Sequence, residues 1–185
     1  LRLPQTHAYY AGSAQRGVLG PYPRNARRMV EDAVRAADPY LDFAAFDADG
    51  GDGEPASGDD DGIVDALVVV HAGPGSELGG PGDILSHNWF TVEPVRTRDG
   101  VAAWTYATVA ESSPLGVRAH ELGHQLGLAD LYDRRSSGFR LAGGLGNWSL
   151  MAAGAWIGGG DSPADLDAAS KVELGFVDPI VPLAN

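Results

Sequence analysis

The chain has 185 residues, enough for one ordinary domain with its own hydrophobic core. Its formal net charge of −12 argues against nucleic acid as a partner, and no apolar run approaches the roughly 20 residues that a membrane span needs. The sequence contains no cysteine, so any zinc ion would have to be held by histidine and carboxylate side chains.

The first half of the chain predicts one helix and at least one strand. Residues 1–23 are rich in Tyr, Gly and Pro without a clear period, and we interpret them as an entering loop with a short edge strand. Residues 25–37 carry apolar side chains at helical spacing until Pro39, which predicts a backing helix. The nearly continuous apolar run over residues 63–70 predicts a buried central strand, and residues 84–95 predict mixed strand and loop.

The second half predicts a strand and two more helices. Residues 102–109 alternate in the manner of a half-buried strand. Ser113 as N-cap and Pro114 in the first turn predict a helix over residues 114–126 that ends at Gly127. Ser162-Pro163 predicts a closing helix over residues 163–174. The expected fold class is therefore α/β (α+β), with a twisted mixed sheet and an irregular C-terminal part.

Acidic residues are concentrated in one segment. Between Arg35 and Arg96 there is no Lys or Arg, whereas there are 13 Asp and Glu. Such a segment repels itself unless a cation is bound, and its spacing resembles a calcium loop interrupted by residues 51–60. The possible calcium ligands are Asp47, Asp49, Asp61 and Asp65, with Asp52, Asp59 and Asp60 as alternative donors. The competing interpretation is a solvated acidic loop.

The run His120-Glu121-Leu122-Gly123-His124 is the motif with the clearest chemistry. Helical residues four positions apart lie about 40° from each other around the axis, so both imidazoles can bind one tetrahedral zinc ion. Glu121 is displaced by about 100°, which suits a general base that takes a proton from a water attacking a carbonyl. The competing interpretation is an amphipathic helix in which this spacing arises by chance.

A catalytic zinc ion needs a third protein ligand and an open position for water. Gly127 can adopt a left-handed conformation that ends the helix and turns the chain back under the metal. Asp130 is then the best candidate for the third ligand. Asp133 is the rival ligand, and otherwise a partner that orients a zinc-binding histidine.

Residues 120–133 together resemble the signature of the immune inhibitor A family of bacterial secreted zinc metallopeptidases, which are similar to the metzincin clan. Three more segments carry the resemblance, which extends from about Tyr40 to Pro179: residues 61–65 with 71–75, residues 147–151, and residues 171–176.

The resemblance implies a metzincin-like fold, with Met151 as the Met-turn residue beneath the metal. In the clan an edge strand near the zinc helix pairs with an extended peptide, so residues 102–109 are expected to form one lip of the cleft. The sequence departs from the clan in two ways. The third ligand is Asp130 where most metzincins have His, and no Tyr follows Met151, so Tyr132 and His71 remain alternative transition-state donors.

The resemblance also implies one catalytic domain over residues 1–185, with the N-terminal part of a longer catalytic domain missing, an upper subdomain 1–127 and a lower subdomain 128–185. The expected function is zinc-dependent endopeptidase action on extracellular proteins or peptides, with other domains or a propeptide of the same precursor as partners. Two alternatives stay open: a non-catalytic zinc- and calcium-binding interaction module, and a zinc hydrolase of a non-peptide bond.

Overall fold

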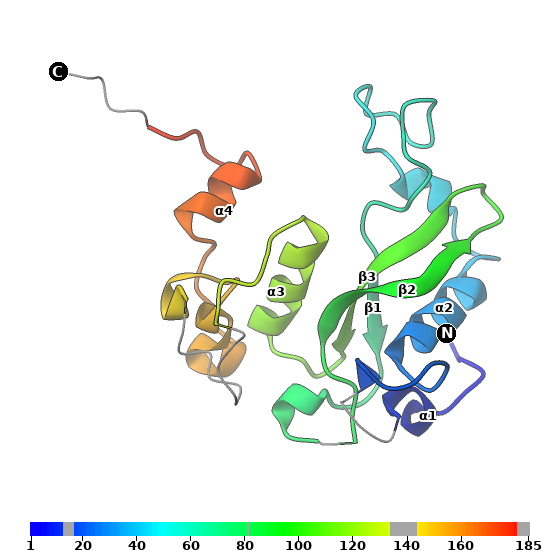
Figure 1. The fold of residues 1–185 in the computed structure, drawn as a ribbon, viewed down its shortest axis with the longest axis horizontal. Helices are drawn as coiled ribbons and strands as arrows, with labels where there is room; N and C mark the ends of the chain where they lie inside the picture. The colour runs from blue at the N-terminus through cyan, green and yellow to red at the C-terminus, as the bar shows by residue number, and fades with distance from the viewer. Residues whose placement is uncertain (13–16, 81, 134–143, 181–185) are drawn as a thin grey trace. The chain divides into compact units, whose positions relative to one another are not determined.

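The computed structural model describes residues 1–12, 17–80, 82–133 and 144–180, which belong to two compact units (Figure 1). Unit 1 comprises residues 1–113 and unit 2 residues 114–185. The expected division at Gly127 stays a prediction, and the expected lower subdomain includes residues 134–143 and 181–185, which lie outside the described residues. None of the described helices is long and apolar enough to cross a membrane.

Unit 1 contains a mixed sheet, as the sequence predicts. Its strands are β1 (Val68–His71), β2 (His87–Arg96) and β3 (Ala102–Ala110), in the order β1-β3-β2 (Figure 1). Strand β1 runs parallel to β3, with Val69 opposite Thr108, and β2 runs antiparallel to β3, with Trp89 opposite Tyr106. The three strands therefore place β3 in the centre.

Two strand predictions are wrong because a local pattern does not reveal a strand's neighbours. The apolar run predicted as the central strand forms only the short β1, which lies at an edge of the sheet and leaves Val68 and Val70 44% and 59% exposed. Ile63 makes only an isolated bridge to Ala102, and the Asp65 N–H bonds to the Phe46 carbonyl rather than to the sheet. Strand β3 is hydrogen-bonded on both sides, so it has no free edge for a peptide.

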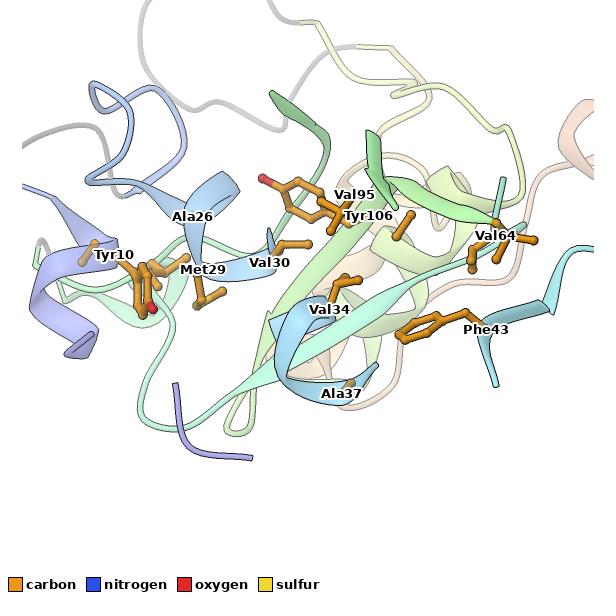
Figure 2. Packing of buried hydrophobic residues seen from close by; sticks show 14 residues of the cluster. Tyr10, Ala26, Met29, Val30, Val34, Ala37, Phe43, Val64, Val95 and Tyr106 are labelled. Atoms are coloured by element: carbon orange, nitrogen blue, oxygen red, sulfur yellow. The ribbon is translucent and has the colours of Figure 1, made fainter. Parts of the chain in front are cut away.

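The predicted backing helix is α2 (Ala26–Ala37), whose N-cap Asn25 accepts a hydrogen bond from the Arg28 N–H. Its apolar face covers the sheet, because Val30 and Val34 belong to the same buried cluster as Val95, Ala103 and Tyr106 of β2 and β3 (Figure 2). At about 25 cal/mol per Å² of apolar surface, this burial is the main source of stability in unit 1.

The entering segment differs from its prediction. It contains the helix α1 (His7–Ala11), capped by the Thr6 side chain, and no strand among its described residues. Tyr10 at the end of α1 donates a 2.8 Å hydrogen bond to Asp32 on α2, which ties this helix to the core. Unit 1 also contains the short 3-10 helices Phe43–Phe46 and Ser76–Leu78.

Unit 2 contains α3 (Leu115–Gln125), the 3-10 helices Gly146–Trp148 and Ala153–Gly160, and α4 (Ala168–Glu173). Helix α3 matches its predicted range, and Gly127 follows it with a φ of +95°. Both predicted N-caps are wrong. Pro114 occupies the N-cap position of α3, without a side-chain hydrogen bond to the helix, and the Ser113 hydroxyl donates to Glu77 instead. Asp167 caps the shorter α4 in place of Ser162.

Candidate active site

The structure brings together the three residues that the sequence predicts as zinc ligands, all in unit 2. His120 and His124 project from adjacent turns of α3, and Asp130 follows the Gly127 turn. The two Nε2 atoms lie 3.1 Å apart, and Asp130 Oδ1 lies 3.2 Å from His120 Nε2 and 3.1 Å from His124 Nε2. The three candidate ligand atoms therefore form a nearly equilateral triangle.

Backbone carbonyls orient both imidazole rings. His120 Nδ1 lies 3.0 Å from the Leu150 carbonyl oxygen, and His124 Nδ1 lies 2.7 Å from the Leu128 carbonyl oxygen. A carbonyl only accepts, so each Nδ1 carries a hydrogen, and a ring in its neutral form then presents an Nε2 lone pair. The sequence motif does not reveal these two carbonyl partners, because they lie outside it.

This donor set fits a divalent metal ion. A tetrahedral ion with ligands at about 2.0–2.1 Å separates neighbouring ligand atoms by roughly 3.3 Å, close to the three distances in the triangle. Two Nε2 lone pairs and a carboxylate oxygen repel one another at this separation unless a proton or a cation lies among them. Imidazole nitrogen with one carboxylate is also a set that zinc accepts.

The charges in the triangle favour an ionised carboxylate. Burial opposes the charge of Asp130, but the adjacent His120 and His124 outweigh burial and hold its pKa well below the ordinary value. Burial also lowers the pKa of His124, yet its contacts with Asp130 and the Leu128 carbonyl outweigh this effect, so the net pKa is raised. The site therefore attracts positive charge.

Other predicted residues are placed as follows. Glu121 is buried on α3 directly after His120. The ring of Tyr132 lies alongside that of His120, with centroids 6.3 Å apart and planes 25° apart. His71 belongs to unit 1, where its ring faces His7 at 5.6 Å. Asp133 is exposed and is not part of the ligand triangle.

Met151 is completely buried and packs against α3. A Cβ atom on Gly123 would lie 2.6 Å from Met151 Sδ, so any larger residue at this helical position would force the Met151 side chain to shift. The neighbouring backbone also touches the site, because the Leu150 carbonyl accepts from His120 and the Met151 carbonyl accepts a 2.8 Å bond from the Leu131 N–H.

Unit 1 contains a second cluster of candidate ligands. One carboxylate oxygen from each of Asp47, Asp49 and Asp65 lies within 4.8 Å of the others. Asp47 is only 1% exposed, and its Oδ1 has no hydrogen-bond partner among the described residues. Burial, followed by the charges of nearby aspartates, raises the pKa of Asp47. A bound cation is one way to compensate a buried carboxylate among other aspartates, and protonation is another.

The other acidic residues of this segment bind backbone N–H groups. Asp61, the fourth predicted calcium ligand, accepts a 2.7 Å bond from the Ile63 N–H and lies outside the group of three. Asp60 accepts from the N–H groups of Gly50 and Ser57, at 2.7 and 2.6 Å. Asp52 and Asp59 likewise accept within residues 50–60. These side chains organise the inserted loop.

Comparison with known proteins extends over most of the chain. Residues 1–174 match the family described as "Immune inhibitor A peptidase M6, catalytic domain". The chain is 34% identical over 197 residues to Immune inhibitor A of Bacillus thuringiensis subsp. alesti, and 31% identical over 192 residues to Pre-pro-metalloprotease PrtV of Vibrio cholerae serotype O1 (strain M66-2). Each comparison covers 92% of this chain, but 28% and 20% of the respective relatives.

Proposed function

Because the chain belongs to the immune inhibitor A (M6) family of metallopeptidases, we propose that it contributes a zinc-dependent endopeptidase site with His120, His124 and Asp130 as ligands. The observation that carries the proposal is the triangle of Nε2, Nε2 and Oδ1 atoms at 3.1–3.2 Å, with both rings oriented by carbonyls. The chain spans only 28% and 20% of its relatives, so the activity of the whole protein is part of the proposal.

Glu121 acts as the general base in this proposal. When bound, zinc would lower the pKa of a water molecule and polarise the scissile carbonyl. Glu121 follows His120 on α3 and is displaced about 100° from it around the helix axis, so we expect its carboxylate to border the ligand triangle without joining it. It accepts the proton of the water as the new C–O bond forms and delivers that proton to the amine as the C–N bond breaks.

We also propose secretion, extracellular protein substrates and a Met-turn role for Met151. Buried Met151 beneath α3 supports a metzincin-like arrangement of unit 2. The name Pre-pro-metalloprotease of the Vibrio cholerae relative denotes a precursor, which supports a propeptide or further domains as partners of this chain.

The decisive test is Glu121→Ala, assayed on casein together with zinc content. We expect cleavage to fall by about 10²- to 10⁴-fold while one zinc ion per chain stays bound, since Glu121 moves a proton and does not bind the metal. Glu173→Ala on α4 is the matched control and should cleave normally. Wild-type cleavage by Glu121→Ala would refute the mechanism.

The two alternative functions give different results in the same assay. An interaction module would bind zinc without cleaving any protein substrate, and the presence of Glu121 argues against it. A hydrolase of a non-peptide bond would leave casein intact but cleave small ester or amide substrates in a phenanthroline-sensitive reaction.

We further propose that Asp47, Asp49 and Asp65 bind calcium, with Asp61 as an outer donor. The buried Oδ1 of Asp47 supports this assignment. Calcium should raise the melting temperature by several degrees, because bound ligand stabilises the folded state. EGTA should reverse the shift, and calcium but not zinc should restore it. Asp47→Asn should remove the response, whereas Asp42→Asn, at an N-cap without a side-chain hydrogen bond, should retain it.

A further inference from the structure

The turn formed by residues 149–151 is hydrogen-bonded to one candidate zinc ligand, His120, and to the residue that follows another, Asp130. The Leu150 carbonyl accepts from His120 Nδ1 at 3.0 Å, which sets the tautomer and the direction of Nε2. The Met151 carbonyl accepts at 2.8 Å from the N–H of Leu131, the residue directly after Asp130. A displacement of this turn would therefore misorient an imidazole and a carboxylate together.

The turn is itself held by a hydrogen-bonded chain that begins at α4. The buried Ser149 hydroxyl accepts a 3.1 Å bond from the Met151 N–H, which closes the turn, and donates a 2.8 Å bond to Asp167 Oδ2. Ser149 thus connects the turn to a carboxylate 18 residues later. The Leu150 N–H of the same turn also donates a 3.0 Å bond to the Asp165 carbonyl, so two contacts link the turn to the segment that precedes α4.

Asp167 is firmly fixed by its own contacts. Its Oδ1 accepts the N–H groups of Ala169 and Ser170 at 3.0 and 3.1 Å, and its Oδ2 accepts the Ser170 hydroxyl at 2.7 Å. Burial opposes its ionisation, but the hydrogen bonds from Ser170 and Ser149 outweigh burial and lower its pKa. It therefore stays charged at neutral pH and accepts a strong hydrogen bond from Ser149.

We propose that Asp167 is a positioning residue for the zinc site, acting through Ser149 and the 149–151 turn on His120 and Asp130. The inference rests on the proposed function, because it assumes that these ligands bind zinc. Partners one step removed from a metal typically change its affinity by about 10- to 100-fold when they are lost. Two hydrogen bonds connect Asp167 to His120, one from the Ser149 hydroxyl and one to the Leu150 carbonyl. The two residues are 47 positions apart in the sequence.

The test measures the zinc dissociation constant by competition with a chromogenic chelator. Ser149→Ala removes the donor of the hydrogen bond between the turn and Asp167. Asp167→Ser removes the acceptor of the same bond but keeps a good N-cap for α4. We expect each to raise the dissociation constant by about 10- to 100-fold. The double variant should bind zinc no more weakly than either single variant, since both remove one interaction.

Two control variants separate positioning from stability. Ser170→Ala removes a hydrogen bond to Asp167 without touching the turn, so it lowers the urea midpoint but leaves zinc affinity within about twofold. Asp165→Asn removes a neighbouring exposed carboxylate that pairs with Lys171, while its backbone carbonyl still accepts from the Leu150 N–H. It should also bind zinc normally. Equal losses in these controls would overturn the proposal.

The outcomes distinguish this inference from the proposed function. If the wild type bound no zinc, or bound it equally well after His120→Ala, the proposed function would fail first. If the wild type bound one zinc ion but Ser149→Ala and Asp167→Ser bound it equally tightly, the positioning role alone would be refuted. Should Ser149→Ala not fold, Asp167→Ser decides the question alone, because its side chain is only partly buried.

Discussion

The two candidate metal clusters differ in how their ligands are held before any ion arrives. In unit 2, carbonyls fix both imidazoles, and His120, His124 and Asp130 already lie at ligand spacing. In unit 1, three carboxylates approach one another, and one oxygen of the buried Asp47 has no hydrogen-bond partner within the part of the chain that the structure describes. A set of two imidazoles and one carboxylate brings one formal negative charge together, whereas three converging carboxylates bring up to three, so repulsion is stronger in unit 1.

The two proposed ions would have different roles. Hydrogen bonds within unit 2 already orient its candidate ligands, so removing the proposed zinc ion should chiefly abolish catalysis. The carboxylates of unit 1 repel one another without a cation, so removing the proposed calcium ion should chiefly lower stability.

The largest expected effect belongs to His124→Ala. It removes one of the two proposed Nε2 ligands, so zinc affinity should fall by more than about 100-fold, which is more than the loss of a residue that only orients a ligand. Casein cleavage should become undetectable, while the calcium-dependent rise in melting temperature remains. Asp47→Asn should show the reverse, with normal zinc content and no calcium response. If His124→Ala kept one tightly bound zinc ion, the proposed zinc site in unit 2 would be wrong.

His87 in unit 1 is also a buried histidine, but it packs in the interior beside Tyr106 and, among the described residues, is not part of a candidate metal site. His87 Nδ1 lies 2.6 Å from the Leu85 carbonyl, and the Nδ1 atoms of His120 and His124 likewise face carbonyls, but His87 Nε2 lies 3.1 Å from the Tyr106 hydroxyl. Burial lowers the pKa of His87 to about 4. The atom that faces Nε2 therefore distinguishes a core histidine from a candidate ligand.

The lowered pKa of His87 should make the stability of the protein depend on pH in the acidic range. Folded His87 binds fewer protons than unfolded His87 between pH values of about 6.5 and 4, so its contribution to stability is lost as pH falls through that window. From pH 7 to pH 5 the loss is about 2 kcal/mol. Urea unfolding should show the gap between wild type and His87→Asn narrowing by that amount. An unchanged gap would mean that His87 does not titrate in this way.

A smaller effect is expected from Gly123→Ala in the packing beneath the zinc helix. The added methyl group would meet Met151 Sδ at 2.6 Å, and overpacking a buried position typically costs about 1–3 kcal/mol. The better helix propensity of Ala offsets only part of this cost. In a Met151→Ala background the same change should cost less, because the sulfur is gone. Equal costs in both backgrounds would exclude this contact as the cause.

The sequence predicted that the three candidate zinc ligands lie close together, because the information that places them is local. His120 and His124 depend on helical spacing, and Asp130 depends on a glycine turn, which the φ of +95° at Gly127 matches. The same reasoning placed α2 within one residue of its observed start. Short-range periodicity and turn chemistry therefore suffice when every partner lies within a few residues.

The sequence did not predict features that depend on distant partners. The run over residues 63–70 was assigned a central strand, but strand order is set by pairing with β3 some 39 residues later in the register Val69 to Thr108. Ser113 was expected to cap α3, but its hydroxyl donates a hydrogen bond to Glu77, which lies 36 residues earlier in the chain. Asp167 was overlooked because its link to Ser149 exists only in the folded chain.

The smallest expected effect distinguishes two aspartates in the acidic segment. Asp61 accepts the Ile63 N–H through Oδ1, and an asparagine can make the same bond, so Asp61→Asn should change stability by less than about 0.5 kcal/mol. Asp49 belongs to the group of three, so Asp49→Asn should weaken the calcium-induced rise in melting temperature much more. Calcium titrations followed by melting temperature compare the two variants, which have equal charge. If Asp61→Asn removed the calcium response and Asp49→Asn kept it, the ion would lie nearer the inserted loop than the buried Asp47 carboxylate indicates.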